Sequence, residues 1–155
     1  MAKRTLLFSE AAAAGLLFAL VASEPAMAQD TTVRQMDAMK IRINVEGATI
    51  TATLEDNETA RDFASLLPLA VTLKDYASTE KIADLPKRLT TGGAPAGIDP
   101  SVGDITYYAP WGNLAIFYKD FGYASGLVKL GTIDSGIEAL DRPGRTEATI
   151  ELIEK

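Results

Sequence analysis

The 155-residue chain contains no histidine and no cysteine, and these two absences narrow its chemistry. Without histidine, the protein lacks the commonest general base and the commonest transition-metal ligand. Catalytic triads that use an imidazole, and zinc sites built from thiolate or imidazole groups, are therefore excluded. Without cysteine no disulfide can form, so the stability of the fold must come from side-chain packing.

Basic residues are also relatively scarce, with 15 Lys and Arg against 21 Asp and Glu and a formal net charge of −6. This balance argues against nucleic acid as a partner, because phosphates require a basic face. Asp99, Asp104 and Asp120 do not have the spacing of an EF-hand loop. The segment 91–97 lacks the lysine and the following helix of a phosphate-binding loop. We therefore expect neither a metal nor a cofactor.

The first 28 residues have the three parts of a secretory signal peptide. Lys3 and Arg4 precede the uncharged run Ala11–Ala22, and Ala26-Met27-Ala28 places small residues at the positions that signal peptidase reads. That run is too short to cross a bilayer core of about 30 Å. We expect cleavage after Ala28, no membrane insertion after cleavage, and a periplasmic or secreted destination in a bacterium.

The rest of the chain is expected to form a single domain after a short leader. Residues 29–38 are polar and show no periodicity, which predicts a flexible leader before a domain over 39–155. Alternation of apolar and polar residues then predicts strands over 40–45, 48–55, 69–76, 105–108, 114–118, 127–133 and 147–152. Residues 78–104 are expected to be a long loop with one brief strand at 87–89.

Two short helices complete this pattern. The first is expected to start at Asp56-Asn57, run for about ten residues and end at Pro68, and the second to be capped by Asp134. In the last strand Ala148, Ile150 and Leu152 are expected to point inward. Because alternation occurs at both ends of the domain, the first and last strands are expected to pair. The sequence predicts a mainly β fold, a closed eight-stranded barrel with two short helices.

Several short segments, in this order along the chain, resemble the small bacterial cyclophilin-like domains. They are Met39-Lys40-Ile41, Leu66-Leu67-Pro68-Leu69, Glu80-Lys81, Leu85-Pro86, Gly103-Asp104-Ile105, residues 114–118 and residues 130–133. The resemblance covers about residues 39–154 and implies an eight-stranded barrel flanked by two helices. It also implies a relation to true cyclophilins, which isomerise the peptide bond before proline by means of an arginine, a glutamine and a hydrophobic pocket.

The chain departs from the isomerase pattern at the positions that carry activity. Where the cyclophilin pattern has glutamine followed by two phenylalanines, this chain has Ile116, Phe117 and Tyr118, and no glutamine follows Gln35. Arg88 is the candidate for the catalytic cation, because a guanidinium can stabilise charge on a carbonyl oxygen. The alternative for Arg88 is a solvated residue that balances an acidic surface.

Aromatic residues are concentrated between positions 107 and 123 and are candidates for a ligand pocket. The candidate ligand-binding residues are Tyr108, Trp111, Phe117, Tyr118, Phe121 and Tyr123. Those on strands could instead fill the barrel core, and Trp111 could simply cover a turn. Glu80-Lys81 could be a structural ion pair or the rim of a pocket, and both roles stay open at this point.

The leading hypothesis is an exported barrel that binds a peptide segment or a small ligand without strong catalysis. One alternative is a divergent prolyl isomerase that assists folding in the periplasm, with Arg88 as electrophile and Phe117 or Tyr118 in the proline pocket. Such an enzyme needs no acid–base pair, because rotation about an amide crosses a barrier of about 18–20 kcal/mol without breaking a covalent bond. A structural or interaction module is the second alternative.

Overall fold

The computed structural model describes residues 38–154. The predicted signal peptide 1–28 and the predicted leader, except for its last residue, lie outside the described residues. Within residues 38–154, no helix has the length and apolarity that a membrane crossing requires.

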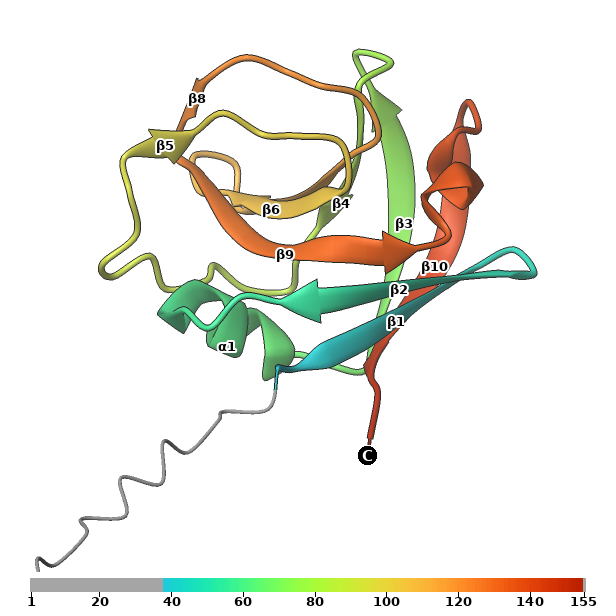
Figure 1. The fold of residues 1–155 in the computed structure, drawn as a ribbon, viewed down its shortest axis with the longest axis horizontal. Helices are drawn as coiled ribbons and strands as arrows, with labels where there is room; N and C mark the ends of the chain where they lie inside the picture. Colours follow the sequence, from blue (N-terminus) through green and yellow to red (C-terminus); the bar gives the residue numbers. More distant parts are fainter. Residues whose placement is uncertain (1–37, 155) are drawn as a thin grey trace, which may run out of the picture. The chain divides into compact units, whose positions relative to one another are not determined.

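Eight antiparallel strands form a closed barrel, as predicted (Figure 1). They are β1 (Lys40–Val45), β2 (Ala48–Leu54), β3 (Leu69–Tyr76), β4 (Glu80–Asp84), β6 (Asp104–Tyr108), β7 (Asn113–Phe117), β9 (Leu127–Ser135) and β10 (Arg145–Leu152). Around the barrel the order is β1-β10-β3-β4-β7-β6-β9-β2, and β2 pairs with β1 to close it. The predicted pairing of the first and last strands is confirmed, with Ile43 opposite Ile150. Closure leaves neither terminal strand with an unpaired edge.

A separate two-stranded sheet is formed by β5 (Gly97–Ile98) and β8 (Ala124–Ser125) (Figure 1). The two strands approach each other so closely that only glycine fits at position 97. A Cβ atom built there would lie 2.3 Å from the backbone oxygen of Ala124. This sheet ties the loop before β6 to the loop between β7 and β9.

The first helix, α1 (Glu58–Ala64), begins where the sequence predicts. Asn57 is its N-cap, and the Asn57 side-chain oxygen accepts a hydrogen bond of 2.8 Å from the Ala60 amide. The helix has seven residues instead of the predicted ten, and Ser65 is its C-cap. Its Phe63 side chain is fully buried, so α1 is anchored to the barrel through its apolar face.

The second predicted helix is a single 3₁₀ turn, η1 (Ile137–Leu140), and its predicted cap was wrong. Gly136 occupies the N-cap position, with φ at 87°, and makes no side-chain cap. Asp134 lies within β9, where its carboxylate accepts hydrogen bonds from Thr53 Oγ1 at 2.8 Å and Lys40 Nζ at 3.1 Å. The Asp134 carboxylate is therefore bonded to side chains of β1 and β2 and does not cap η1.

Two further expectations about strands were wrong. Residues 87–89 belong to no strand, and the eighth strand is β4, inside the segment predicted to be a loop. The alternation of β4 is hard to recognise because one of its two buried residues is Lys81, with 2% exposure. Leu152 points inward as expected, because it pairs with the core residue Ile41, but it is 42% exposed since it is the last residue of β10, where the barrel wall ends.

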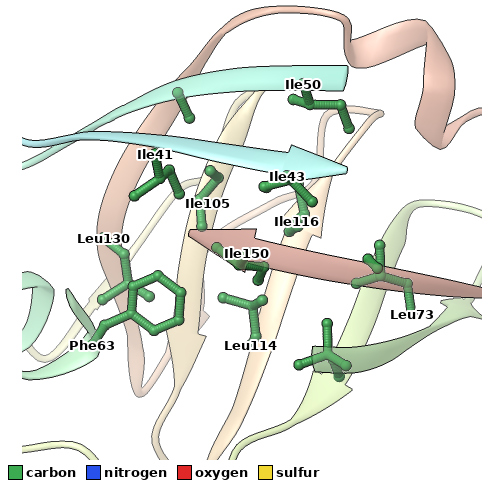
Figure 2. Packing of buried hydrophobic residues seen from close by; sticks show 14 of the residues in the cluster. Ile41, Ile43, Ile50, Phe63, Leu73, Ile105, Leu114, Ile116, Leu130 and Ile150 are labelled. Atoms are coloured by element: carbon green, nitrogen blue, oxygen red, sulfur yellow. The ribbon is translucent and has the colours of Figure 1, made fainter. Parts of the chain in front are cut away.

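The interior of the barrel is filled with aliphatic side chains (Figure 2). Residues from all eight barrel strands and α1 meet there, including Ile41, Ile43, Ile50, Phe63, Leu73, Ile105, Leu114, Leu130 and Ile150. An eight-stranded barrel is just wide enough for its own side chains to fill. Since the interior of this barrel is occupied by its own side chains, the outer wall and the loops are the places left for a ligand.

Candidate functional site

A second, smaller hydrophobic cluster lies on the outer face of the barrel wall. Side chains alternate along β7, so Leu114 and Ile116 enter the core whereas Ala115 and Phe117 face outward. Ala115, Phe117 and Leu127 form the buried part of this cluster, and Tyr108 and Ala124 pack against it. The cluster brings together β6, β7, β8 and the start of β9.

Strand register then arranges side chains of this outer face in two rows. Tyr76 pairs with Glu80 and Glu80 pairs with Phe117, across β3, β4 and β7. Asn113 pairs with Tyr108 and Tyr108 pairs with Leu127, across β7, β6 and β9. Directly opposite residues of an antiparallel pair point to the same face of the sheet.

The outer face has a cavity of about 190 Å³ between these rows. Four aromatic side chains line it: Tyr76, Tyr108, Trp111 and Phe121. The other lining residues are Glu80, Asn113, Ala115, Ala124 and Leu127. Benzene fills an engineered protein cavity of about 150 Å³, whereas drug-sized ligands occupy about 300–1,000 Å³. This cavity therefore has room for one ring or one short chain.

Trp111 is at the centre of the aromatic group. It lies in the turn between β6 and β7 and is 58% exposed. Its ring meets those of Tyr76 and Tyr108 edge-to-face, with centroids 5.6 and 5.3 Å away. Phe121 packs against the buried Phe117 ring at 6.2 Å. Such edge-to-face and tilted pairs are the favoured geometry for aromatic rings and fix their orientation.

The turn that carries Trp111 is held from both sides. Arg88 donates a hydrogen bond of 2.8 Å to the carbonyl oxygen of Ala109 and a longer one, 3.5 Å, to that of Pro110. On the other side Gly126 has φ of +81°, and a Cβ atom there would lie 2.7 Å from the Pro110 ring. Arg88 and Gly126 together position the turn and hence the Trp111 ring.

Glu80 has an unusual electrostatic environment for a surface glutamate. It is the only formally charged residue among those that line the cavity, and no Lys or Arg of residues 38–154 forms a salt bridge with it. Burial raises the pKa of the Glu80 carboxyl, since no hydrogen bond or nearby cation compensates for its desolvation. The neighbouring Asn113 side chain is also buried, and its Oδ1 atom has no hydrogen-bond partner in the described part of the chain.

Comparison with known sequences now identifies the barrel. A sequence model of the cyclophilin-like family matches residues 43–151. The chain belongs to this cyclophilin-like family. The resemblance inferred from short segments is thereby confirmed.

A solved structure is similar in fold to this cyclophilin-like domain. It is the solution structure of a hypothetical protein from Archaeoglobus fulgidus, with a TM-score of 0.56 and 22% sequence identity. The alignment covers 74% of this chain and 94% of the archaeal one. At that identity the likeness supports the fold alone. No curated protein matches the sequence.

Lys81, the neighbour of Glu80, points to the opposite face of the cyclophilin-like barrel. Its ammonium group lies 3.0 Å from the Asp75 carboxylate, donates a hydrogen bond to the carbonyl oxygen of Arg142, and lies 5.7 Å from the centre of the Tyr118 ring. The Tyr118 hydroxyl in turn donates a hydrogen bond of 2.6 Å to Asp75. Lys81, Asp75 and Tyr118 form a satisfied polar cluster at one end of the core.

The ionisation of this inner cluster reflects its hydrogen bonds. The hydrogen bond from Tyr118, with help from Lys81, lowers the pKa of Asp75 below its ordinary value. Burial, together with the Asp75 carboxylate, raises the pKa of Tyr118 to about 12. Glu80-Lys81 therefore has both roles considered from sequence: Lys81 makes a structural ion pair and Glu80 lines a cavity.

The structure brings together only part of the predicted binding group. Tyr108, Trp111 and Phe121 line the cavity, and Phe117 is buried behind Phe121. Tyr118 belongs to the inner cluster, and Tyr123 is 63% exposed and does not line the cavity. Arg88 also lies outside it, on the turn carbonyls.

Sequence reasoning missed Tyr76 and Asn113 as parts of the site, and it left open whether Glu80 borders a pocket. Tyr76 and Glu80 flank the β3–β4 turn, while Trp111 and Asn113 lie more than 30 positions later. The alternation along 69–76 places Tyr76 on the outward face, and this was the one signal available. Only the register of β4 against β7 brings these residues together.

A larger hollow of about 400 Å³ lies beside α1 and β9. It is bordered by the glycine-containing segment 92–95 and by Glu55, Glu58 and Lys129. The Lys129 ammonium is already 2.9 Å from Asp104, and Glu58 accepts a hydrogen bond from Thr90. In the described residues no group of three potential metal ligands is present. Lys129 and Glu58 at this hollow therefore already have polar partners, whereas Glu80 and the Asn113 Oδ1 atom at the aromatic cavity do not.

Proposed function

We propose that this cyclophilin-like protein is exported and binds a small ligand, or one side chain of a peptide, in the aromatic cavity of its outer wall. One observation carries the proposal: four aromatic side chains from separate segments converge on a hollow of about 190 Å³. The core is filled with its own side chains, so this face is the natural place for a ligand.

The exposure of these aromatic residues supports a binding role. Tyr76, Trp111 and Phe121 are each 44–58% exposed and lie around one hollow. Isolated apolar residues on a surface need no explanation, but a group that surrounds a cavity is typical of a binding site. Rings of this kind supply apolar contact area with few rotatable bonds to immobilise.

The binding role predicts a signal from Trp111, which is the only tryptophan of the chain. In a screen of small molecules by amide NMR, we expect hits to shift the Trp111 indole N–H and the amides of β4 and β7. Trp111→Ala should abolish these shifts, while Tyr123→Ala, which changes an exposed ring outside the cavity, should retain them. Hits that shift only residues around the 400 Å³ hollow would contradict the assignment of the site.

Weak or absent catalysis forms part of the same proposal. The nine residues that line the cavity include no arginine or lysine, and the guanidinium of Arg88 donates to turn carbonyls. Prolyl isomerase activity remains the alternative, with Arg88 as its candidate cation. NMR exchange measurements on Xaa-Pro peptides separate the two: the binding role predicts no acceleration at high micromolar protein. Acceleration that disappears in Arg88→Ala would favour the isomerase.

Export is proposed from the signal-like segment 1–28. Expression of the full-length chain in a Gram-negative host should yield a periplasmic protein that starts at Gln29, which N-terminal sequencing detects. Replacement of Ala26 and Ala28 by bulky residues should block processing. Recovery of the unprocessed chain in the cytoplasm would contradict export without affecting the binding proposal.

A further inference from the structure

We propose that the ligand of the aromatic cavity carries a positively charged alkylammonium group of about the size of a lysine side chain. Glu80 would pair with the charge, and the rings of Tyr76, Tyr108 and Trp111 would contact the ammonium group and the alkyl chain next to it. The proposal rests on the binding role of this cavity and adds to it the chemical class of the ligand.

The strongest support is a comparison of Glu80 with the other perturbed carboxylates of the same domain. Asp62, Asp75 and Asp134 each lie within 3.1 Å of a lysine ammonium and each accept a further hydrogen bond. Glu80 is partly buried as well, yet it has no such cation among residues 38–154. A desolvated carboxylate is costly unless a cation or a donor compensates for it. Glu80 thus lacks the partner that this chain gives to its other perturbed carboxylates.

The aromatic rings that line the cavity together with Glu80 favour a cationic ligand over a neutral one. Tryptophan and tyrosine attract cations to the negative faces of their rings. A cation–π contact of this kind occurs inside the barrel, where the Lys81 ammonium lies 5.7 Å from the centre of the Tyr118 ring. In the cavity Tyr76 and Tyr108 flank Trp111, but no lysine or arginine is among the lining residues.

Asn113 offers a second acceptor in the wall of the same cavity. Its Oδ1 atom is buried and has no partner in the described chain. An unpaired buried acceptor is rare in folded proteins and calls for a donor. An alkylammonium has three N–H donors, so a donor remains for an acceptor in the cavity wall after the Glu80 carboxylate is paired.

The volume of the cavity and the net charge of the chain both agree with an alkylammonium ligand. A cavity of about 190 Å³ has room for a short alkyl chain but not for a drug-sized molecule. The net charge of −6 over the whole chain attracts cations from solution and repels anions. An anionic or phosphate-bearing ligand would meet Glu80 without any compensating lysine or arginine in the cavity.

The test compares matched charged and neutral probes on the intact exported domain. The probes are n-butylammonium and butan-1-ol, followed by a capped lysine (Nα-acetyl-lysine N-methylamide) and its Nε-acetylated form. Binding is read from the fluorescence and the indole N–H resonance of Trp111. We expect each charged probe to bind at least about 10-fold more tightly than its neutral partner. Tighter binding of the capped lysine than of n-butylammonium would identify a peptide side chain as the source of the amine.

Three variants assign the effect to named groups. Glu80→Gln keeps the shape of the side chain and should weaken n-butylammonium about 10-fold, with little change for butan-1-ol. Glu147→Gln removes an equal charge from an exposed position on β10 and should leave both affinities unchanged. Asn113→Leu removes the unpaired amide and should weaken the charged probe only. A folded state is verified for each variant by its amide NMR spectrum.

The outcomes separate this inference from the binding role. If butan-1-ol binds as tightly as n-butylammonium, or if Glu80→Gln has no effect, the preference for a cation is refuted while the cavity remains a ligand site. If neither pair of probes perturbs Trp111, both the inference and the proposed binding role of the cavity fail. Selective, Glu80-dependent binding of the charged probes supports both.

Discussion

Glu80 and Lys81 are adjacent in β4, yet their charged groups have opposite surroundings. Lys81 points into the barrel, where it is 2% exposed and contacts Asp75, the Arg142 carbonyl and the Tyr118 ring. Glu80 points to the outer wall, where it lines a cavity together with four aromatic side chains and no basic residue of 38–154 pairs with it. The buried charge, on Lys81, thus has hydrogen-bond and ionic partners, whereas the more accessible charge, on Glu80, has no basic partner.

This contrast separates the structural and the functional face of one strand. A buried ion must be paired and hydrogen-bonded, because an isolated charge in the interior is strongly destabilising. A charge at the surface can remain without a partner at a smaller cost, and it then remains available to a ligand. Strand alternation puts the two kinds of charge one residue apart.

The largest expected effect comes from breaking the inner cluster. Asp75→Ala leaves the Lys81 ammonium buried without its carboxylate, and removing one partner of a buried pair costs about 3–5 kcal/mol. Because the Asp75 side chain is 23% exposed, we expect about 3 kcal/mol. Urea unfolding of the variant and the parent domain measures the loss.

Asp84→Ala is the matched control for this prediction. Asp84 ends β4, the strand that carries Lys81, and also lies near a lysine, with its carboxylate 3.7 Å from the Lys74 ammonium, but its side chain is 89% exposed. Such exposed pairs contribute little, so a change within about 0.5 kcal/mol is expected. Equal destabilisation by the two variants would contradict the special role of the inner cluster.

Tyr118→Phe has the next largest expected effect, because it removes the hydrogen bond to Asp75. A hydrogen bond to a charged group contributes about 1.5–3 kcal/mol, so a loss of about 1.5 kcal/mol near neutral pH is expected. This loss should also change with pH at both ends of the scale.

The change at low pH comes from the Asp75 carboxyl, and the change at high pH comes from the Tyr118 hydroxyl. The pKa of Asp75 is lowered in the folded state, so its contribution to stability is present above its ordinary value of 3.8 and is lost as the pH falls. Tyr118→Phe should therefore move acid unfolding to higher pH. The pKa of Tyr118 is raised from 10.0 to about 12, so the parent domain should lose stability between these values and the variant should not. Denaturation midpoints across the pH range test both limits, and parallel curves would contradict the assignment.

The parts of the fold that were predicted from sequence are those with local, apolar signals. Strands β1, β2 and β10 alternate regularly, and Asn57 precedes an amphipathic segment, so each could be recognised within about ten residues. Strand β4 could not, because its inward position 81 is a lysine whose burial depends on Asp75, Tyr118 and a carbonyl 61 residues away. A charge compensated by distant groups leaves no apolar pattern in the strand itself.

The candidate site was predicted in part for the same reason. Tyr108, Trp111 and Phe121 are aromatic residues in or beside a turn or loop, and that local signal was sufficient. Phe117 and Tyr118 were grouped with them, but neighbouring residues in a strand point to opposite faces, and the sequence alone did not show which face had the cavity. Glu80 and Tyr76 joined the site only through the register of β3, β4 and β7.

The smallest expected effect on stability concerns the outer charge and has the opposite sign. Burial raises the pKa of Glu80 above its ordinary value of 4.5, so the folded state holds this proton to higher pH than the unfolded chain does. The parent domain should therefore lose some stability as the pH rises through and above 4.5. Glu80→Gln should be more stable than the parent at pH 7, and the difference should be much smaller at pH 4, where the glutamate is mostly protonated. Paired urea unfolding curves at these two pH values test this prediction. If Glu80→Gln were instead less stable at pH 7, the carboxylate would be part of the architecture, as Lys81 is, and would not be a charge retained for a ligand.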